Sequence, residues 1–193
     1  FGVRGVEGYP VLVELDMANG LPAYTTVGLP DNAVRESRER VSSAVRNSGY
    51  QFPSRRITVN LAPAQSRKEG THFDLPIAIA VLSASGQIPG GDWERRYCFI
   101  GELALDGAIC PVPGVLAMAD KARAQGFKGI VVPVENAAEA QAAGLNAFGA
   151  GCLREVADFL SLPQGALFPN AVPAVPGASR PAPAEELSDV KGQ

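Results

Sequence analysis

Short stretches rich in β-branched residues alternate with longer helical stretches along most of this chain, and this alternation restricts its fold more than any other feature. Residues 10–16, 23–28 and 57–61 have the composition of short strands, and an Asn19-Gly20 turn separates the first two. Helical stretches follow the second and the third of them. The pattern predicts an α/β (α+β) domain over residues 1–161, with helices packed on a mixed sheet.

Helix boundary signals support two of these helices. The first is expected from Asp31 to Ser48, with Asp31 as N-cap and Gly49 as its stop. The second is expected from Asp74 to Ser85, with Asp74 as its cap. Because the second stretch is apolar on nearly all sides, it predicts a central, buried helix.

The remaining elements follow in the second half of the chain. Strands are expected at 97–105 and 108–110, flanking the hairpin signal Asp106-Gly107. Further elements are expected in chain order: a helix at 114–125, a strand at 129–132, and helices near 136–143 and 152–161.

The composition changes after residue 161. Residues 162–186 are rich in Pro, Ala and Gly, with few residues that a core would bury. Such a segment predicts a mobile linker without ladder pairing. The polar residues 187–193 follow it.

Several classes of function lack their sequence signals. The only histidine, His72, and the three widely spaced cysteines Cys98, Cys110 and Cys152 offer no metal-ligand spacing, so we expect no metal site. Neither a GxxxxGK[ST] loop nor a GxGxxG fingerprint occurs, so we expect no tightly bound ATP and no other cofactor in this chain. No signal peptide or membrane-spanning apolar run is present, and the unpaired cysteines favour a cytoplasmic location.

Positive charge is concentrated between residues 35 and 68. This stretch has a net charge of +6, whereas the whole chain has −3. Such a patch neutralises phosphates without reading sequence, which predicts weak, non-specific DNA binding. Contacts to other subunits or domains are an alternative, and an ordinary solvated helix face with i,i+4 pairs is another. The candidate DNA-binding residues are Arg35, Arg38, Arg55, Arg56, Arg67 and Lys68.

A set of short motifs resembles one family. They are VGLPD at 27–31, VRESRERV at 34–41, NSGY at 47–50, RITVNLAPA at 56–64, RKEG at 67–70, FDLPIA at 73–78, GEL at 101–103 and Asp106-Gly107. Together they resemble the opening domain of the ComM/YifB family, the magnesium-chelatase-like AAA+ ATPases, across residues 1–161. Residues 188–193 resemble the segment that opens the AAA+ module in this family, so residues 187–193 are expected to begin that module.

The resemblance implies a Lon-like fold and raises the question of peptidase activity. In this family the front domain resembles the Lon protease domain, which is related to a ribosomal-protein fold. The resemblance places His72 and Leu116 at the positions of the Lon serine and lysine. Thr71 and Lys121 are the nearest substitutes, and neither lies at the matching position. Because a hydroxyl nucleophile needs a nearby base, a Lon-like peptidase is disfavoured.

The resemblance also implies a setting for the domain. ComM-like proteins resemble hexameric, ATP-driven DNA helicases that act in branch migration during natural transformation. ATP and magnesium would then bind the parent's ATPase module, and the chain would contact DNA, its own AAA+ module and other subunits. We therefore expect a non-catalytic accessory domain for DNA engagement or ring assembly, not an enzyme. The alternative is an oligomerisation collar without DNA contact.

Overall fold

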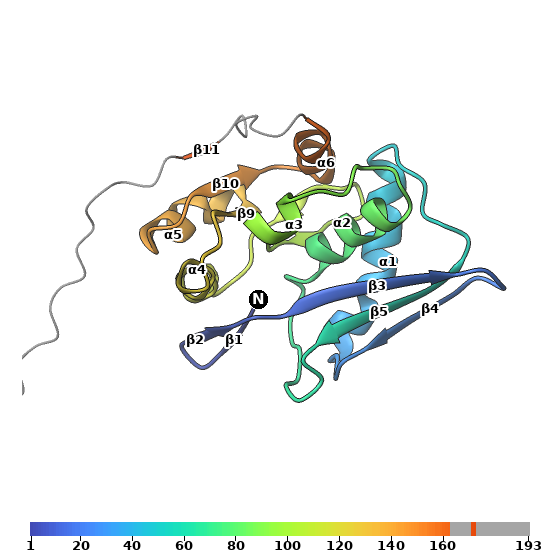
Figure 1. The fold of residues 1–193 in the computed structure, drawn as a ribbon, viewed down its shortest axis with the longest axis horizontal. Coiled ribbons are helices and arrows are strands. Elements are labelled where there is room, and N and C mark those ends of the chain that lie inside the picture. The colour runs from blue at the N-terminus through green and yellow to red at the C-terminus, as the bar shows by residue number, and fades with distance from the viewer. Residues whose placement is uncertain (163–170, 173–193) are drawn as a thin grey trace, which may run out of the picture.

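The structure is a computed structural model that describes residues 1–162 and the backbone of residues 171–172. Three adjacent strands form its first sheet, in the order β3 (Leu12–Ala18), β5 (Arg56–Ala62) and β4 (Ala23–Val27). β3 is antiparallel to β5, whereas β4 is parallel to it. A parallel pair needs a crossover, and helix α1 (Asn32–Asn47) provides it between β4 and β5 (Figure 1).

A second sheet contains four strands, in the order β11 (Ala171–Val172), β10 (Ala147–Ala150), β9 (Gly129–Pro133) and β6 (Tyr97–Phe99). Its central strand β9 is buried along its whole length. Val131 belongs to the apolar core that includes α2 and α6, whereas Ile130 and Val132 belong to the core that includes α4. Both faces of this sheet are therefore covered, which explains a strand that is apolar throughout.

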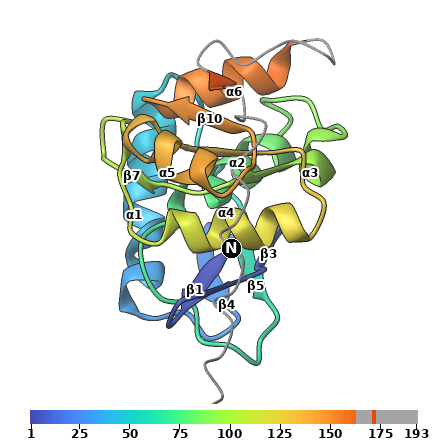
Figure 2. The same ribbon diagram turned by 90° about the vertical axis from the view of Figure 1, so that its left-hand side faces the viewer.

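Helices cover the two faces of the second sheet. Figure 2 shows α4 across the front of the molecule with the hairpin strand β1 near it. The bounds of these and the remaining elements are α2 (Asp74–Ala84), α3 (Trp93–Arg96), α4 (Val115–Ala124), η1 (Val134–Asn136), α5 (Ala137–Ala142), α6 (Leu153–Ser161), β1 (Gly2–Arg4), β2 (Glu7–Tyr9), β7 (Glu102–Leu103) and β8 (Ile109–Cys110).

Helix α2 lies at the centre of the fold, as its apolar composition predicts. It contacts α1, α6, β3, β6 and β7 (Figure 1). Asp74, however, does not cap this helix, because the residue at the N-cap position is Phe73 and no side chain caps the first turn. Asp74 forms the first residue of the helix and is buried.

The expected α/β class is confirmed: the strands form several small sheets, and the three-stranded and four-stranded sheets are both mixed. The expected strand 97–105, however, is interrupted. The backbone leaves β6 at Ile100 and Gly101: Gly101 N–H donates to His72 O at 3.1 Å, and Leu75 N–H donates to Gly101 O at 3.0 Å. These bonds turn the chain towards α2, and β7 pairs with β8 instead.

Two residues of the expected linker do form a ladder. Ala171 and Val172 pair antiparallel with β10, which corrects the prediction that nothing in this segment would pair. The predicted mobility of the rest of residues 162–186, and the module start at 187–193, lie outside the described residues.

Candidate functional site

The motif segments meet around a polar network at the N-terminal ends of α1 and α2. Asp31 caps α1 by accepting a hydrogen bond from Val34 N–H at 2.8 Å, as its sequence position predicts. Its second oxygen accepts one from Gly70 N–H at 3.2 Å. The backbone of Lys68 also pairs with Leu29 and Asp31, at 3.0 and 2.9 Å. The GLPD and RKEG motifs are therefore two halves of one local structure.

The centre of the network is an ion pair between α1 and α2. Arg40 Nε and Nη2 donate to the two carboxylate oxygens of Asp74 at 2.6 and 3.1 Å. Arg40 Nη2 also donates to Ala33 O, and Leu103 N–H donates to Asp74 at 3.2 Å. Burial raises the pKa of the Asp74 carboxyl against the opposing effect of Arg40. The hydrogen bonds to Asp74 raise the pKa of Arg40.

The pair was not predicted from the sequence, because Asp74 resembles a helix cap there. A signal was available: Asp74 stands between Phe73 and Leu75 in an apolar stretch, and a buried carboxylate needs a cationic or hydrogen-bonding partner.

Thr71 connects the loop before α2 to β7. Its hydroxyl donates to the Glu102 carboxylate. Glu102 also lies close enough to Arg40 to favour its charged form. A hydroxyl bonded to a carboxylate in this way is anchored, and its acceptor is Glu102 rather than the lysine of a Lon-type dyad.

His72 and Leu116, the positions aligned with the Lon dyad, lie in different surroundings. His72 is buried against the Phe73 ring, with ring centroids 4.1 Å apart, and its Nε2 has no hydrogen-bond partner among the described residues. Burial lowers the pKa of His72 to about 4. Leu116 is half-exposed in the first turn of α4, where its N–H donates to Glu139 at 2.9 Å. Lys121 is exposed on the same helix.

Lys68 is not a surface residue. Its side chain is fully buried, and its ammonium donates to Pro63 O and to Ser66 O. Burial lowers the pKa of this amine. Lys68 therefore holds the 63–68 loop together from within, which removes it from the set of residues that can contact DNA.

The exposed arginines of the predicted patch lie at two ends of the β4–α1–β5 unit. Arg35 follows the end of β4, and Arg67 adjoins the Lys68 backbone that pairs with Pro30. Arg55 and Arg56 lie at the opposite end, where Arg56 is paired with Ala23 at the start of β4. Arg35 and Arg67 are therefore separated from Arg55 and Arg56 along the length of this unit.

Two of these arginines also have acidic neighbours on the surface. Arg38 is 3.8 Å from Glu39, and Arg67 is 3.2 Å from Glu69. Arg55 and Arg56 form no ion pair with the other residues that the structure describes. The end with Arg55 and Arg56 is therefore the stronger candidate for a phosphate contact.

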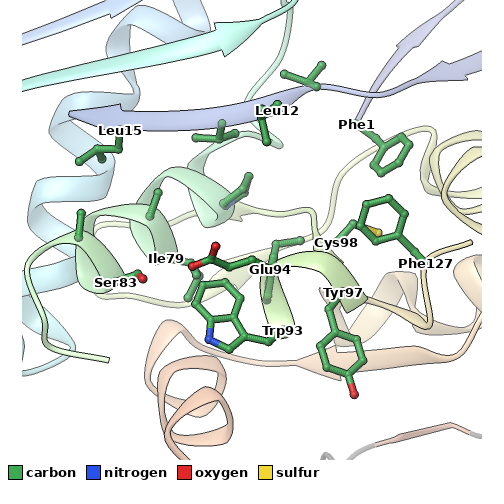
Figure 3. Close-up of a pocket in the computed structure, with 16 residues that line it drawn as sticks. Phe1, Leu12, Leu15, Ile79, Ser83, Trp93, Glu94, Tyr97, Cys98 and Phe127 are labelled. Atoms are coloured by element: carbon green, nitrogen blue, oxygen red, sulfur yellow. The ribbon is translucent and has the colours of Figure 1, made fainter. Parts of the chain in front are cut away.

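An open groove of about 370 Å³ lies between β3, α2 and α3 (Figure 3). Its lining is mostly apolar, and Figure 3 shows Ser83 and Glu94 among the few polar side chains there. The Cys98 thiol also lines the groove, but burial raises its pKa to about 12. Cys98 is therefore a structural, unreactive thiol at neutral pH.

Residues 1–162 and 171–172 contain neither a candidate metal site nor a candidate membrane-spanning helix. No group of three or more His, Cys, Asp or Glu side chains in these ranges is placed to hold a metal ion. Within the same ranges, no helix has both the length and the apolar character needed to cross a bilayer.

The fold and the network define a mixed α/β domain with a buried Arg40–Asp74 ion pair between two of the motif segments. A family model described as "Subunit ChlI of Mg-chelatase" matches residues 13–136. The chain therefore belongs to this Mg-chelatase-subunit family, and its relatives include YifB and ComM proteins.

Three relatives illustrate the range of similarity. The uncharacterized protein YifB of Escherichia coli (strain K12) is 43% identical over 194 residues, covering 98% of this chain and 36% of YifB. Competence protein ComM of Haemophilus influenzae is 40% identical over 158 residues, covering 81% of this chain and 31% of ComM. A Lon protease of Halothermothrix orenii is 25% identical over 131 residues, covering 64% of this chain and 16% of the protease. The chain spans about a third of the length of its YifB and ComM relatives.

Proposed function

We propose that this chain is a non-catalytic accessory domain of a ComM-like hexameric AAA+ ATPase, an ATP-driven DNA helicase of branch migration in natural transformation. Its contribution is to engage DNA weakly and without sequence preference, and to help assemble the ring. The similarity to a competence protein over 81% of the chain supports this setting. In the proposal the domain has the Lon-like fold and works in the cytoplasm. Residues 162–186 link it to an AAA+ module that begins at 187–193 and binds ATP and magnesium.

The observation that carries the non-catalytic role is the state of the Thr71 hydroxyl. It donates to the Glu102 carboxylate rather than to a lysine or histidine, so the serine–lysine pairing of Lon has no counterpart at this hydroxyl. His72 is buried against Phe73, and Lys68 donates to two carbonyl groups. Each group with nucleophilic or basic chemistry in this loop therefore has a structural role.

The N-termini of three helices also support a domain that does not bind ATP itself. Asp31 accepts from the first turn of α1, Glu139 from Leu116 N–H of α4, and Glu155 from Gly151 N–H ahead of α6. A carboxylate already occupies each of these positive ends, where a nucleotide phosphate would otherwise bind. This arrangement supports a domain that leaves ATP binding to another module.

The DNA contact in this proposal rests on Arg55 and Arg56. The test is fluorescence anisotropy of the 193-residue chain with duplex, single-stranded and four-way-junction DNA at 50 and 200 mM salt. With ~2 phosphates contacted by these two side chains, raising the salt from 50 to 200 mM lowers the duplex affinity by roughly tenfold. Reversing both charges (Arg55→Glu with Arg56→Glu) weakens binding equally on unrelated sequences, because phosphates carry no sequence information.

The matched control reverses another adjacent exposed pair, Arg95 and Arg96 on α3, and leaves the affinity within about twofold of the wild type. Absence of binding at millimolar protein concentration overturns the DNA role. If the Arg55–Arg56 reversal instead changes self-association, the domain is an oligomerisation collar. ATP hydrolysis by the chain, or cleavage of unfolded protein that is lost on Thr71→Ala, overturns the non-catalytic role.

A further inference from the structure

Two arginine–aromatic pairs lie in and beside the loop that follows α1. The guanidinium of Arg46, in the last turn of α1, lies 5.7 Å from the centre of the Phe52 ring. The guanidinium of Arg154, in the first turn of α6, lies 5.9 Å from the centre of the Tyr50 ring. Both arginines are exposed, and both rings are half-buried against the core. Residues far apart in the sequence thus build one surface feature.

The loop that carries these rings is held firmly. Gln87 exchanges two hydrogen bonds with the Gln51 backbone, both at 2.7 Å. Tyr50 N–H donates to Val45 O at 3.1 Å, and Arg154 donates to Ser48 O at 2.5 Å. A surface already ordered in this way loses little entropy when a ligand binds.

The same loop leads directly to Arg55 and Arg56. We define the basic–aromatic strip as Arg46, Tyr50, Phe52, Arg55, Arg56 and Arg154. All four arginines are exposed, while Asp158, 3.5 Å from the Tyr50 hydroxyl, is an acidic group at its margin. Asp106 lies at another margin, since Asn47 bonds Leu105 O and Gly107 adjoins Ser48. The strip thus combines clustered positive charge with flat π-systems.

We propose that the basic–aromatic strip is a binding surface for single-stranded DNA. Unpaired bases stack on the exposed sides of the Arg46 and Arg154 guanidinium groups, which lie over the Phe52 and Tyr50 rings. Arg55 and Arg56 bind the phosphates of the same strand. This inference rests on the proposed DNA role and specifies its surface and its preferred form of DNA.

The combination of groups favours a single strand over a duplex. Bases within a duplex are stacked on one another, so a duplex offers this surface only its phosphates. An unpaired strand offers phosphates and exposed base faces together, and such faces stack on aromatic and guanidinium planes without regard to sequence. An acidic peptide would complement the positive charge of the strip, but it would offer no bases to stack on the guanidinium groups.

The test separates stacking from charge. Lysine keeps the positive charge of arginine but lacks its flat guanidinium. Arg46→Lys with Arg154→Lys lowers affinity of the 193-residue chain for a fluorescein-labelled oligo-dT strand by roughly tenfold or more. Affinity for a duplex of equal length changes by less than about twofold. The matched control, Arg35→Lys with Arg67→Lys at the opposite end of the β4–α1–β5 unit, changes neither affinity.

Arg46→Lys alone is measured as well, because Arg154 also holds Ser48 O and its loss can disturb the loop. Melting temperatures verify that each variant is folded. The inference is overturned if Arg46→Lys and the double variant are folded and bind oligo-dT like the wild type. The DNA role itself survives that result if charge reversal at Arg55 and Arg56 still abolishes binding. It is also overturned if the strip variants alter only self-association. If the wild type binds neither DNA, the proposed function itself fails.

Discussion

The Arg40 guanidinium contacts both carboxylate oxygens of Asp74, at 2.6 and 3.1 Å, and thereby joins the middle of α1 to the first residue of α2. The Asp74 side chain is only 1% exposed and that of Arg40 is 19% exposed. Taking two such charges out of water costs about as much as their attraction returns. We therefore infer that the pair fixes how the two helices meet and adds little net stability.

Removing one partner of this pair should be far more costly than removing both. Asp74→Leu takes from the largely buried Arg40 the carboxylate that accepts two of its hydrogen bonds, so we expect the free energy of unfolding to fall by about 3–5 kcal/mol. Adding Arg40→Met to Asp74→Leu should recover part of that loss. Urea unfolding of the two single variants and the double variant measures the coupling, and strictly additive losses contradict it.

The exposed pair formed by Arg123 and Asp120 on α4 is the control. Its nitrogen and oxygen are 3.1 Å apart, but the side chains are 52% and 59% exposed. Asp120→Ala should therefore change the free energy of unfolding by no more than ~1 kcal/mol.

Elements whose signals are local were predicted well. The helix expected from Asp31 to Ser48 is α1 (Asn32–Asn47), because its cap and its glycine stop act within one turn of its ends. The strand expected at 57–61 is β5 (Arg56–Ala62), and the one expected at 129–132 is β9. The Asp106-Gly107 turn does join two paired strands. Such signals need no knowledge of distant residues.

Relations between distant residues could not be predicted in the same way. The division into small sheets depends on which strands pair, and the break at Gly101 depends on bonds to His72 and Leu75. The interior position of Lys68 depends on carbonyl groups that surround its ammonium. Arg154 reaches Tyr50 from 104 positions away in the sequence, so no local pattern reveals the basic–aromatic strip.

Lys68 should affect stability and leave DNA binding unchanged. Lys68→Met removes the donor from Pro63 O and Ser66 O inside the loop, so we expect a loss of about 1–3 kcal/mol in the free energy of unfolding. The neighbouring exposed Arg67 is the control, and Arg67→Met should change stability by less than about 0.5 kcal/mol. Chemical unfolding and anisotropy on the same samples measure both effects. If Lys68→Met keeps its stability but binds DNA more weakly, Lys68 belongs to the surface that contacts DNA.

Gly28 of the GLPD motif should not tolerate a side chain. Its φ is +97°, and an added Cβ would lie 2.2 Å from Leu61 O, a backbone atom of β5. Gly28→Ala therefore combines left-handed strain with a backbone clash, and we expect a loss of about 3 kcal/mol or more. Gly126→Ala is the control, since Gly126 has φ +85° with open space around it. Its expected cost is only the ~1–2 kcal/mol of left-handed strain. Equal melting temperatures for the two variants would contradict this account.

His72 should make the domain less stable in mild acid. Burial lowers its pKa from 6.5 to about 4, so the unfolded chain takes up a proton at a higher pH than the folded chain does. Stability from this residue is therefore complete above pH 6.5 and decreases as the pH falls from 6.5 to 4. The total loss is about 3 kcal/mol, since each unit of pKa difference corresponds to ~1.4 kcal/mol.

Replacing His72 by glutamine isolates this contribution from that of the carboxyl groups. Glutamine does not titrate, so His72→Gln removes only the histidine part of the pH dependence, while Asp and Glu residues contribute alike to both proteins. The free energy of unfolding, measured in urea at pH 7.5 and pH 4.5, should fall more for the wild type than for His72→Gln, by about 2–3 kcal/mol. Parallel losses in the two proteins would mean that His72 is protonated as readily in the folded chain as in the unfolded one. Its imidazole would then be open to water, and the proposal that the loop between Lys68 and Asp74 has no catalytic role would need to be reconsidered.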